Sequence, residues 1–125
     1  MVDLNFLKKI NDNFGHEKGN IAIKKICDIV CKTFSHSSVF RLGGDEFVAI
    51  VLNDDFKNIQ VLLEKFSATM SQIWKQENLE PWERVSAAIG YAQFDVTKDR
   101  DIKDTFKRAD DLMYENKHAM RATRD

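Results

Sequence analysis

The sequence predicts an α/β (α+β) fold in which helices flank a central, mostly antiparallel sheet. Helical and strand-like patterns alternate along the chain, which is typical of a sheet layered by helices. Two strand-like runs are joined by Gly43-Gly44-Asp45, and glycines between such runs indicate a β-hairpin. One proline and five glycines among 125 residues leave few breaks, so long regular elements should dominate a single domain over residues 1–125.

The N-terminal half is expected to contribute a stub of strand, two helices and a hairpin. Apolar residues spaced three and four apart predict the helices, and β-branched and aromatic runs predict the strands. The expected ranges are a stub before Asp3, helices over 5–13 and 20–34, and hairpin strands over 39–42 and 46–52. The second helix is expected to be capped at Gly19-Asn20. The second hairpin strand is apolar on both faces, which suits a strand covered on both sides.

The C-terminal half is expected to contribute two helices separated by a strand. Asn53-Asp54-Asp55 is expected to cap a long helix that runs to Trp74. A third clear strand is expected over 84–94, and a last helix over 102–121. The spacing places Phe106, Ala109 and Met113 on the inward face of that last helix.

Charge and composition exclude several classes of protein. The chain has 19 Lys+Arg and 20 Asp+Glu, and this balance argues against a domain that grips nucleic acid electrostatically. No apolar run is long enough to cross a membrane, and no leader pattern opens the chain. Cys27 and Cys31 lie four apart on one predicted helix face, where they suit small buried hydrophobes better than a disulfide. These features predict a cytoplasmic, reduced protein.

Three clusters could carry chemistry. Asp3 stands at a strand-to-helix junction, where a carboxylate can hold a divalent ion or merely cap the helix. Asp45 and Glu46 are adjacent acids at the hairpin tip, where a shared Mg²⁺ would relieve their repulsion, although a polar turn is the plainer interpretation. Lys117 and Arg121 share one helix face, where they could hold phosphate or simply offset the helix dipole.

Four segments together resemble the GGDEF domain, the diguanylate cyclase family. They are DLNFLKKINDNFGHEKGN, RLGGDEF, AAIGYAQF and RADDLMYENK, and they occur in the family's order at compatible spacing. The resemblance runs from Asp3 to Arg121, nearly the whole chain. It implies a nucleotidyl-cyclase-like fold whose first strand is largely missing here, because only two residues precede Asp3. It also implies that two GTP molecules condense to cyclic di-GMP on a homodimer, with release of pyrophosphate.

The resemblance assigns the metal and the chemistry to five residues. Asp3, the backbone carbonyl of Leu4 and Asp45 would bind Mg²⁺ or Mn²⁺. Asp45 would also be the candidate base for the 3′-hydroxyl, with Glu46 as its acidic neighbour. Lys8 would offset the charge that grows on the transferring phosphate.

The resemblance also assigns substrate contacts. Asn11 and Asn20 fall where the family reads the guanine edge, with His16 between them, and Lys117 and Arg121 match its C-terminal phosphate contacts. Asn20 departs from the commoner Asp, and an amide oxygen is a weaker acceptor than a carboxylate.

The departures from the family pattern support an alternative of another class. Asn5 replaces a commoner Asp, and Met120 stands where a glycine is usual. The family's N-terminal segment and the sensory domains that usually precede it are absent from the 125 residues. The alternative is a catalytically weak or inactive GGDEF-like module that binds GTP or a protein partner. Neither interpretation involves nucleic acid or a membrane segment.

Overall fold

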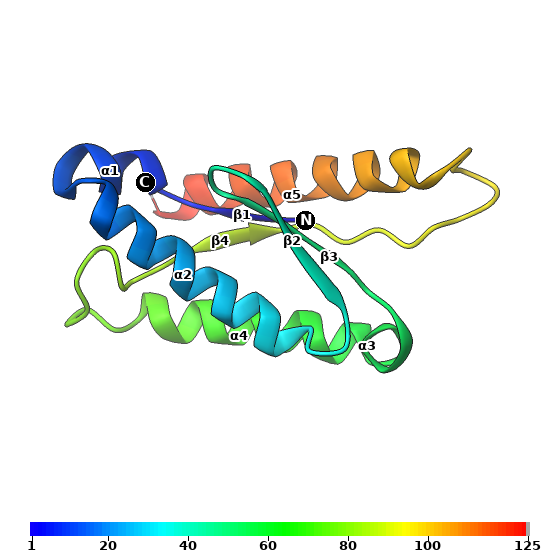
Figure 1. Cartoon of the computed structure of the whole chain (residues 1–125), viewed down its shortest axis with the longest axis horizontal. Helices are drawn as coiled ribbons and strands as arrows, with labels where there is room; N and C mark the ends of the chain where they lie inside the picture. The colour runs from blue at the N-terminus through cyan, green and yellow to red at the C-terminus, as the bar shows by residue number, and fades with distance from the viewer. Residues whose placement is uncertain (125) are drawn as a thin grey trace.

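The computed structural model describes the backbone of residues 1–124 and the side chains of residues 1–120. In this part of the chain the elements are β1 (Val2–Leu4), α1 (Leu7–Phe14), α2 (His16–Thr33), β2 (Ser38–Gly43), β3 (Glu46–Ile50), α3 (Asn53–Lys57), α4 (Ile59–Trp74), β4 (Ala87–Ile89) and α5 (Ile102–Arg124). The strands form one sheet in the order β2-β3-β1-β4, and every neighbouring pair is antiparallel. The predicted α+β architecture is therefore confirmed (Figure 1).

The short β1 lies inside the sheet. Val2 is opposite Phe47 of β3 on one side and Ile89 of β4 on the other. Successive side chains of a strand point to opposite faces. Val2 and Leu4 both belong to the core that α2 and α4 cover, so Asp3 points to the other face.

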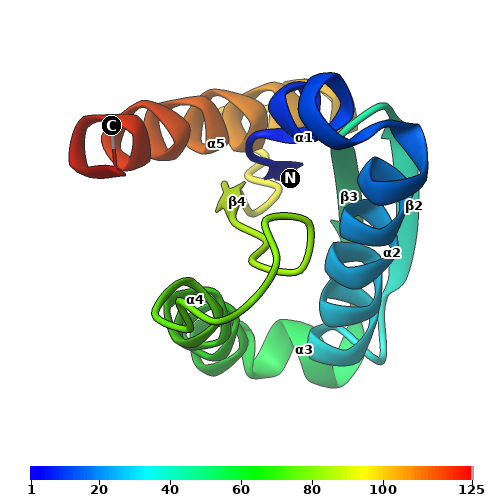
Figure 2. The ribbon, with the colours of Figure 1, turned by 90° about the vertical axis from the view of Figure 1, so that its left-hand side faces the viewer.

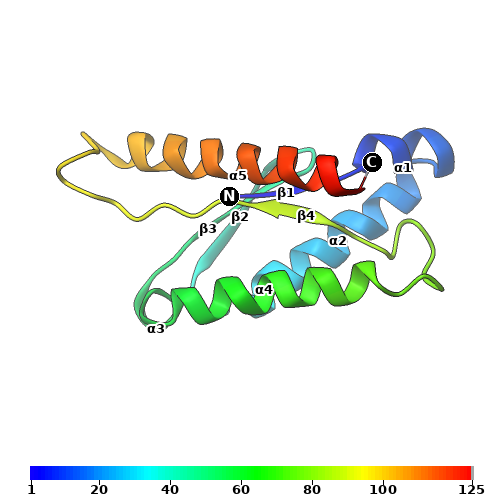
Figure 3. The same ribbon diagram turned by 180° about the vertical axis from the view of Figure 1, so that it is seen from behind.

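The two faces of the sheet carry separate apolar clusters. The larger cluster joins β1 and β3 to α2 and α4 through residues such as Ile26, Val30 and Phe66. The smaller cluster joins Ala88 of β4 to Ala109 and Met113 of α5. Figure 2 and Figure 3 show α4 and α5 on opposite sides of β4. Helix α5 therefore covers the face to which Asp3 points.

Gly90 permits the close approach of α5 to the sheet. A Cβ at this position would stand 2.1 Å from the carbonyl oxygen of Ala109 and 2.2 Å from the backbone nitrogen of Met113. Those atoms belong to the helix backbone and cannot move aside as a flexible side chain could. The glycine thus fixes the distance between β4 and α5.

Several expected boundaries were wrong. Helix α2 begins at His16 rather than after Gly19-Asn20, because Gly15 at φ 90° already breaks the chain. The long helix expected from Asn53 is split into α3 and α4, and the Asp55 carboxylate accepts hydrogen bonds from the His36 backbone nitrogen and the Ser37 hydroxyl instead of capping. The strand expected over 84–94 is limited to Ala87–Ile89, the residues that pair with β1.

The expected burial was also wrong at some positions. Ala109 and Met113 are buried as predicted, but Phe106 is 42% exposed. Ile50 of β3 is exposed, so this strand is not covered on both sides throughout. Cys27 is half-buried against the larger cluster, whereas Cys31 is exposed. Among the described helices, none is both long enough and apolar enough to cross a membrane.

Candidate active site

The Asp3 carboxylate is buried between the sheet and α5. Its Oδ2 accepts a hydrogen bond from Lys117 Nζ at 2.8 Å, and the two side chains are only 9% and 18% exposed. The other oxygen, Oδ1, is buried and has no hydrogen-bond partner among the described residues. A buried acceptor without a donor carries a desolvation penalty of about 1–3 kcal/mol or more. The position is therefore incomplete without a further donor or cation.

The electrostatic surroundings of Asp3 disfavour its negative charge. Burial raises the pKa of this carboxyl above its ordinary value, and the nearby charge of Asp45 raises the pKa further. The hydrogen bond and charge of Lys117 act in the opposite direction but do not cancel the burial effect. The Lys117 ammonium therefore offsets the cost of burying the negative charge of Asp3 only in part.

The hairpin tip is held by backbone contacts that place Asp45 beside β1. Gly43 and Gly44 have φ angles of 133° and 47°, which side chains rarely allow. The Arg41 guanidinium closes the turn by donating to the Gly44 carbonyl oxygen at 3.1 and 2.8 Å. The Leu4 backbone nitrogen donates to the Asp45 carbonyl oxygen at 2.8 Å. These contacts place the Asp45 backbone beside Leu4 and next to Asp3.

Glu46 lies directly across from Asp3 in the β1–β3 register. Burial raises the pKa of Glu46, and the charges of Asp3, Asp110 and Asp45 raise the pKa further, while Lys117 lowers it. Sequence reasoning missed Asp110. Its position seven residues before Lys117, about two helical turns, was the available signal, because such residues share a helix face.

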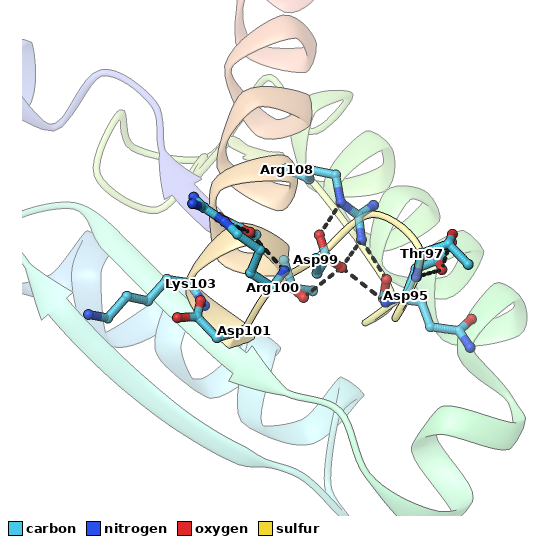
Figure 4. A network of polar contacts seen from close by, with 10 residues as sticks. Asp95, Thr97, Asp99, Arg100, Asp101, Lys103 and Arg108 are labelled. Carbon is cyan, nitrogen blue, oxygen red and sulfur yellow. Dashed lines mark hydrogen bonds and ion pairs between the residues drawn. The ribbon is translucent and has the colours of Figure 1, made fainter.

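Helix α5 is anchored at its start by the buried carboxylate of Asp99 (Figure 4). Arg108 donates to both oxygens of Asp99, at 2.9 Å from Nε and 2.5 Å from Nη2. The Thr105 hydroxyl and the Asp95 backbone nitrogen also donate to Asp99 Oδ2, at 2.9 and 3.0 Å. Arg108 further donates to the Gln93 carbonyl oxygen at 2.7 Å. The network joins the preceding loop to α5, the helix that carries Lys117.

We expect Asp99→Asn to lower the melting temperature at pH 7, and the deficit to shrink as the pH falls below about 4. The Arg108 hydrogen bond, more than any other contact, holds the pKa of Asp99 well below its usual range. A depressed carboxyl pKa stabilises the fold above the unfolded-state pKa, and this contribution is lost as acid approaches the folded-state pKa. Melts by circular dichroism between pH 3 and 7, with the exposed Asp54→Asn as control, check this. A deficit that stays constant over that range would contradict it.

A cavity of about 480 Å³ opens beside the cluster of Asp3, Asp45 and Glu46. Its wall includes the residues Leu4, Asn5, Phe6, Leu7, Lys8, Lys9, Asp12, Asn13, Asp45, Lys117 and Met120. Lys8 pairs with Asp12 at 2.9 Å, and both side chains are well exposed, so the pair adds little stability. Lys8 can therefore exchange this partner for a phosphate at little cost.

Asn5 has a structural role where the family usually has an acid. Its side-chain nitrogen donates to the Ser86 hydroxyl at 3.1 Å and to the Met120 sulfur at 3.6 Å. Its backbone nitrogen donates to the Ser86 carbonyl oxygen at 2.7 Å. A carboxylate could not donate to the sulfur. Two of the departures from the family pattern, Asn5 and Met120, therefore contact one another.

The residues expected to read guanine lie apart from this cavity wall. Asn11 packs against Gly19, where a Cβ would stand 1.8 Å from Asn11 Oδ1, and that oxygen is buried without a hydrogen-bond partner among the described residues. His16 and Asn20 are exposed on the first turns of α2. Arg121 lies on α5, but its side chain is outside the described part of the chain.

The donor set fits a divalent cation that also binds phosphate. The described residues contain no group of three His, Cys, Asp or Glu side chains placed to hold a metal ion. Mg²⁺, however, is usually held by one or two carboxylates together with substrate phosphates and water. Asp3, whose Oδ1 has no hydrogen-bond partner among the described residues, and the nearby Asp45 could supply those two carboxylates.

Comparisons with known proteins show the family to which the chain is similar. Residues 1–123 match the family described as "Diguanylate cyclase, GGDEF domain". The chain is 31% identical over 119 residues to diguanylate cyclase DgcS of Shewanella oneidensis, covering 94% of this chain and 38% of that protein. It is 27% identical to the probable diguanylate cyclase DgcJ of Escherichia coli, of which it covers 22%. The chain thus spans well under half the length of these relatives.

Two solved structures have a similar fold. The active GGEEF domain of a diguanylate cyclase from Vibrio cholerae superposes with a TM-score of 0.74 at 26% identity, over 94% of this chain and 74% of that one. The GGDEF domain of DgcB from Caulobacter crescentus, solved in complex with c-di-GMP, has a TM-score of 0.72 at 19% identity. With the family match spanning 123 residues, the chain belongs to the GGDEF domain family of diguanylate cyclases.

Proposed function

We propose that this domain joins two GTP molecules into cyclic di-GMP and releases pyrophosphate. The observation that carries the proposal is the buried Oδ1 of Asp3, which has no hydrogen-bond partner among the described side chains and lies beside Asp45 and Lys117. Two neighbouring carboxylates and an ammonium on a flexible stem, beside a cavity that Asp45 and Lys117 line, are what a metal–phosphate ligand needs. The names of the family and of the relatives agree with this chemistry.

The reaction is a phosphoryl transfer that occurs twice. In each half, the 3′-oxygen of one GTP bonds to the α-phosphorus of the other, and the bond from the α-phosphorus to the bridging oxygen breaks. Pyrophosphate leaves with that electron pair, and the 3′-hydroxyl loses its proton to a base. Such transfers depend on positioning and on compensating the charge of the phosphate oxygens.

The residues of the cavity wall and the neighbouring acids can divide this work among them. Asp3, the Leu4 carbonyl oxygen and Asp45 would hold Mg²⁺ or Mn²⁺, which supplies charge compensation for the phosphates when bound. Asp45 is the candidate base that accepts the proton of the 3′-hydroxyl, and Glu46 stands beside it as a second acid. Lys8 would move from Asp12 to a phosphate oxygen, a short change for an exposed side chain. Lys117 would contact the phosphates from α5, with Arg121 one turn further along the helix.

Recognition of the base is assigned to the junction of α1 and α2. Asn11 at the end of α1 and Asn20 on α2 would hydrogen-bond the guanine edge, with His16 between them in the sequence. Each subunit would bind one GTP and present its 3′-hydroxyl to the GTP on the other subunit. Closing the ring therefore needs two subunits that face one another. A homodimer is therefore part of the proposal. GTP as the substrate and the free thiols of Cys27 and Cys31 favour a cytoplasmic location.

The direct test is incubation of the purified domain with GTP and Mg²⁺, followed by chromatographic separation of the nucleotides. Cyclic di-GMP and pyrophosphate should appear together, at one cyclic product per two pyrophosphates. Product formation should fall steeply on dilution of the protein, because two subunits must meet. GTP that remains intact at high protein and metal concentrations would contradict the proposal.

A second candidate function is a GGDEF module that binds GTP without turnover. Two observations favour it: Lys117 already forms an ion pair with Asp3, and Asn20 lies outside the cavity wall. Calorimetric binding of GTP with no product after long incubation would identify this case.

We expect Asn20→Asp to tighten GTP binding by about tenfold, because a carboxylate accepts charge-assisted hydrogen bonds from the two guanine donors. Asn20 is exposed, so the added charge costs little folding stability. Titration calorimetry of GTP into both proteins checks this, with Asn78→Asp in the exposed loop after α4 as the matched control. Unchanged or weaker affinity for Asn20→Asp would show that this position does not read the base.

A further inference from the structure

Two ion pairs with a deeply buried carboxylate stand out among the described residues, and they differ in completeness. Asp99 uses both oxygens, and Arg108, Thr105 and a backbone nitrogen supply its donors. Asp3 has Lys117 on Oδ2, whereas its Oδ1 accepts no hydrogen bond from any donor in the described part of the chain. A pair kept only for stability would be expected to satisfy its carboxylate, as Asp99 does. The Asp3–Lys117 pair is therefore the protein part of a site that can take a further cation.

The charges around Lys117 also indicate that a further cation can be accommodated there. Asp3, Asp45 and Glu46 gather at one end of the β1–β3 pair, and Asp110 adds a fourth acid from α5. Among the described residues, Lys117 is the cation that acts on both Asp3 and Glu46, and the Met1 N-terminal ammonium acts on Asp110. These two described ammonium groups do not balance the four acids, so one further cation can be accommodated beside Lys117 or in its place.

Lys117 also borders a cavity in which its ammonium could bind a second partner. Its side chain borders the same cavity as Lys8 and Asp45, and the ammonium is carried on a flexible four-carbon stem. A phosphate in that cavity would be a second partner within the reach of this stem. Unlike the fork of an arginine, an ammonium exchanges one oxygen for another without a fixed orientation.

We propose that Lys117 is a tethered counter-cation that occupies Asp3 in the nucleotide-free domain and competes with the divalent metal for that carboxylate. Metal alone must displace Lys117 into water, whereas metal with nucleotide offers the ammonium a phosphate in exchange. The domain therefore binds metal weakly by itself and strongly together with the nucleotide. This inference rests on the proposed function, because it assigns Lys117 a second role at the proposed metal site.

The test is the affinity of the nucleotide-free protein for Mn²⁺, measured from the electron paramagnetic resonance signal of free Mn²⁺. Lys117→Met retains most of the stem and removes the competing charge. We expect it to bind Mn²⁺ at least about tenfold more tightly than the parent, because the cation no longer has to displace an ammonium. The control is Lys107→Met on the same helix, which removes only the exposed pair with Asp111 and should leave Mn²⁺ affinity unchanged. Equal or weaker Mn²⁺ binding by Lys117→Met would overturn the inference.

A second variant tests the inference if Lys117→Met folds poorly. Lys117→Arg keeps a cation beside Asp3 and can reach both carboxylate oxygens, including Oδ1, which has no hydrogen-bond partner among the described residues. We expect this variant to bind Mn²⁺ more weakly than the parent, with a melting temperature in EDTA that is at least as high. Tighter or unchanged Mn²⁺ binding by Lys117→Arg would overturn the competition.

The outcome is separable from that of the proposed function. A parent domain that makes cyclic di-GMP, with no gain in Mn²⁺ affinity for Lys117→Met, overturns the counter-cation and leaves the cyclase intact. A gain in Mn²⁺ affinity in a domain without turnover supports the counter-cation and favours the GTP-binding module. Absence of Mn²⁺ binding in both the parent and Lys117→Met overturns both, because the metal site itself is then missing.

Discussion

Asp45→Asn is expected to lower the rate of cyclic di-GMP formation by at least about 100-fold while leaving the fold intact. The substitution removes a proposed metal ligand and the candidate base in one step. It preserves the backbone carbonyl that accepts the hydrogen bond from Leu4, and Gly43 and Gly44 continue to form the turn. The amide is nearly the same size as the carboxylate, so the hairpin has no reason to rearrange.

The measurement is product formation from GTP and Mg²⁺, with the far-ultraviolet circular dichroism spectrum as the check on folding. Asp111→Asn is the matched control, because Asp111 is an exposed acid on α5 whose partner is Lys107. It should retain the parent rate. Turnover in Asp45→Asn close to that of the control would remove Asp45 from the catalytic machinery.

Gly90→Ala is expected to destabilise the domain by about 3 kcal/mol or more, the upper part of the range for an overpacked core. The added methyl would overlap backbone atoms of Ala109 and Met113, so α5 would have to move away from β4. Because Lys117 lies on the same helix, the shift should also weaken its hydrogen bond to Asp3. Urea denaturation of parent and variant measures the difference.

Gly44→Ala separates this packing effect from backbone strain. A Cβ at Gly44 meets nothing within 4 Å, but its φ of 47° lies in the left-handed region. Its cost should be about 1–2 kcal/mol, the penalty for a non-glycine residue in that conformation. A smaller loss of stability for Gly90→Ala than for Gly44→Ala would contradict the close contact between β4 and α5.

The parts of the fold that the sequence predicts well depend on local patterns. The hairpin follows from two strand-like runs joined by Gly43-Gly44, and the helices follow from apolar residues at helical spacing. The hairpin and the helices need no knowledge of distant contacts. The proximity of Asp3 and Asp45 was expected from the family resemblance instead, and the β1–β3 register places Asp3 beside the start of β3.

The features that were missed depend on contacts between distant segments. Asp55 was expected to cap a long helix, but His36 and Ser37 supply its donors from another part of the chain. The strand expected over 84–94 is short because β1 offers only three residues for pairing. The Asp3–Lys117 pair joins residues 114 positions apart, so no local pattern indicates it.

The central claim is that Asp3 and Asp45 share a divalent cation that holds the nucleotide. The most direct test is anomalous X-ray diffraction from crystals grown with Mn²⁺ and a non-hydrolysable GTP analogue. The structure predicts one strong Mn²⁺ peak within about 2.5 Å of carboxylate oxygens of both Asp3 and Asp45. Lys117 Nζ should then lie on the phosphates and no longer at 2.8 Å from Asp3 Oδ2. A bound nucleotide with Mn²⁺ elsewhere, and the Asp3–Lys117 pair intact, would contradict the account.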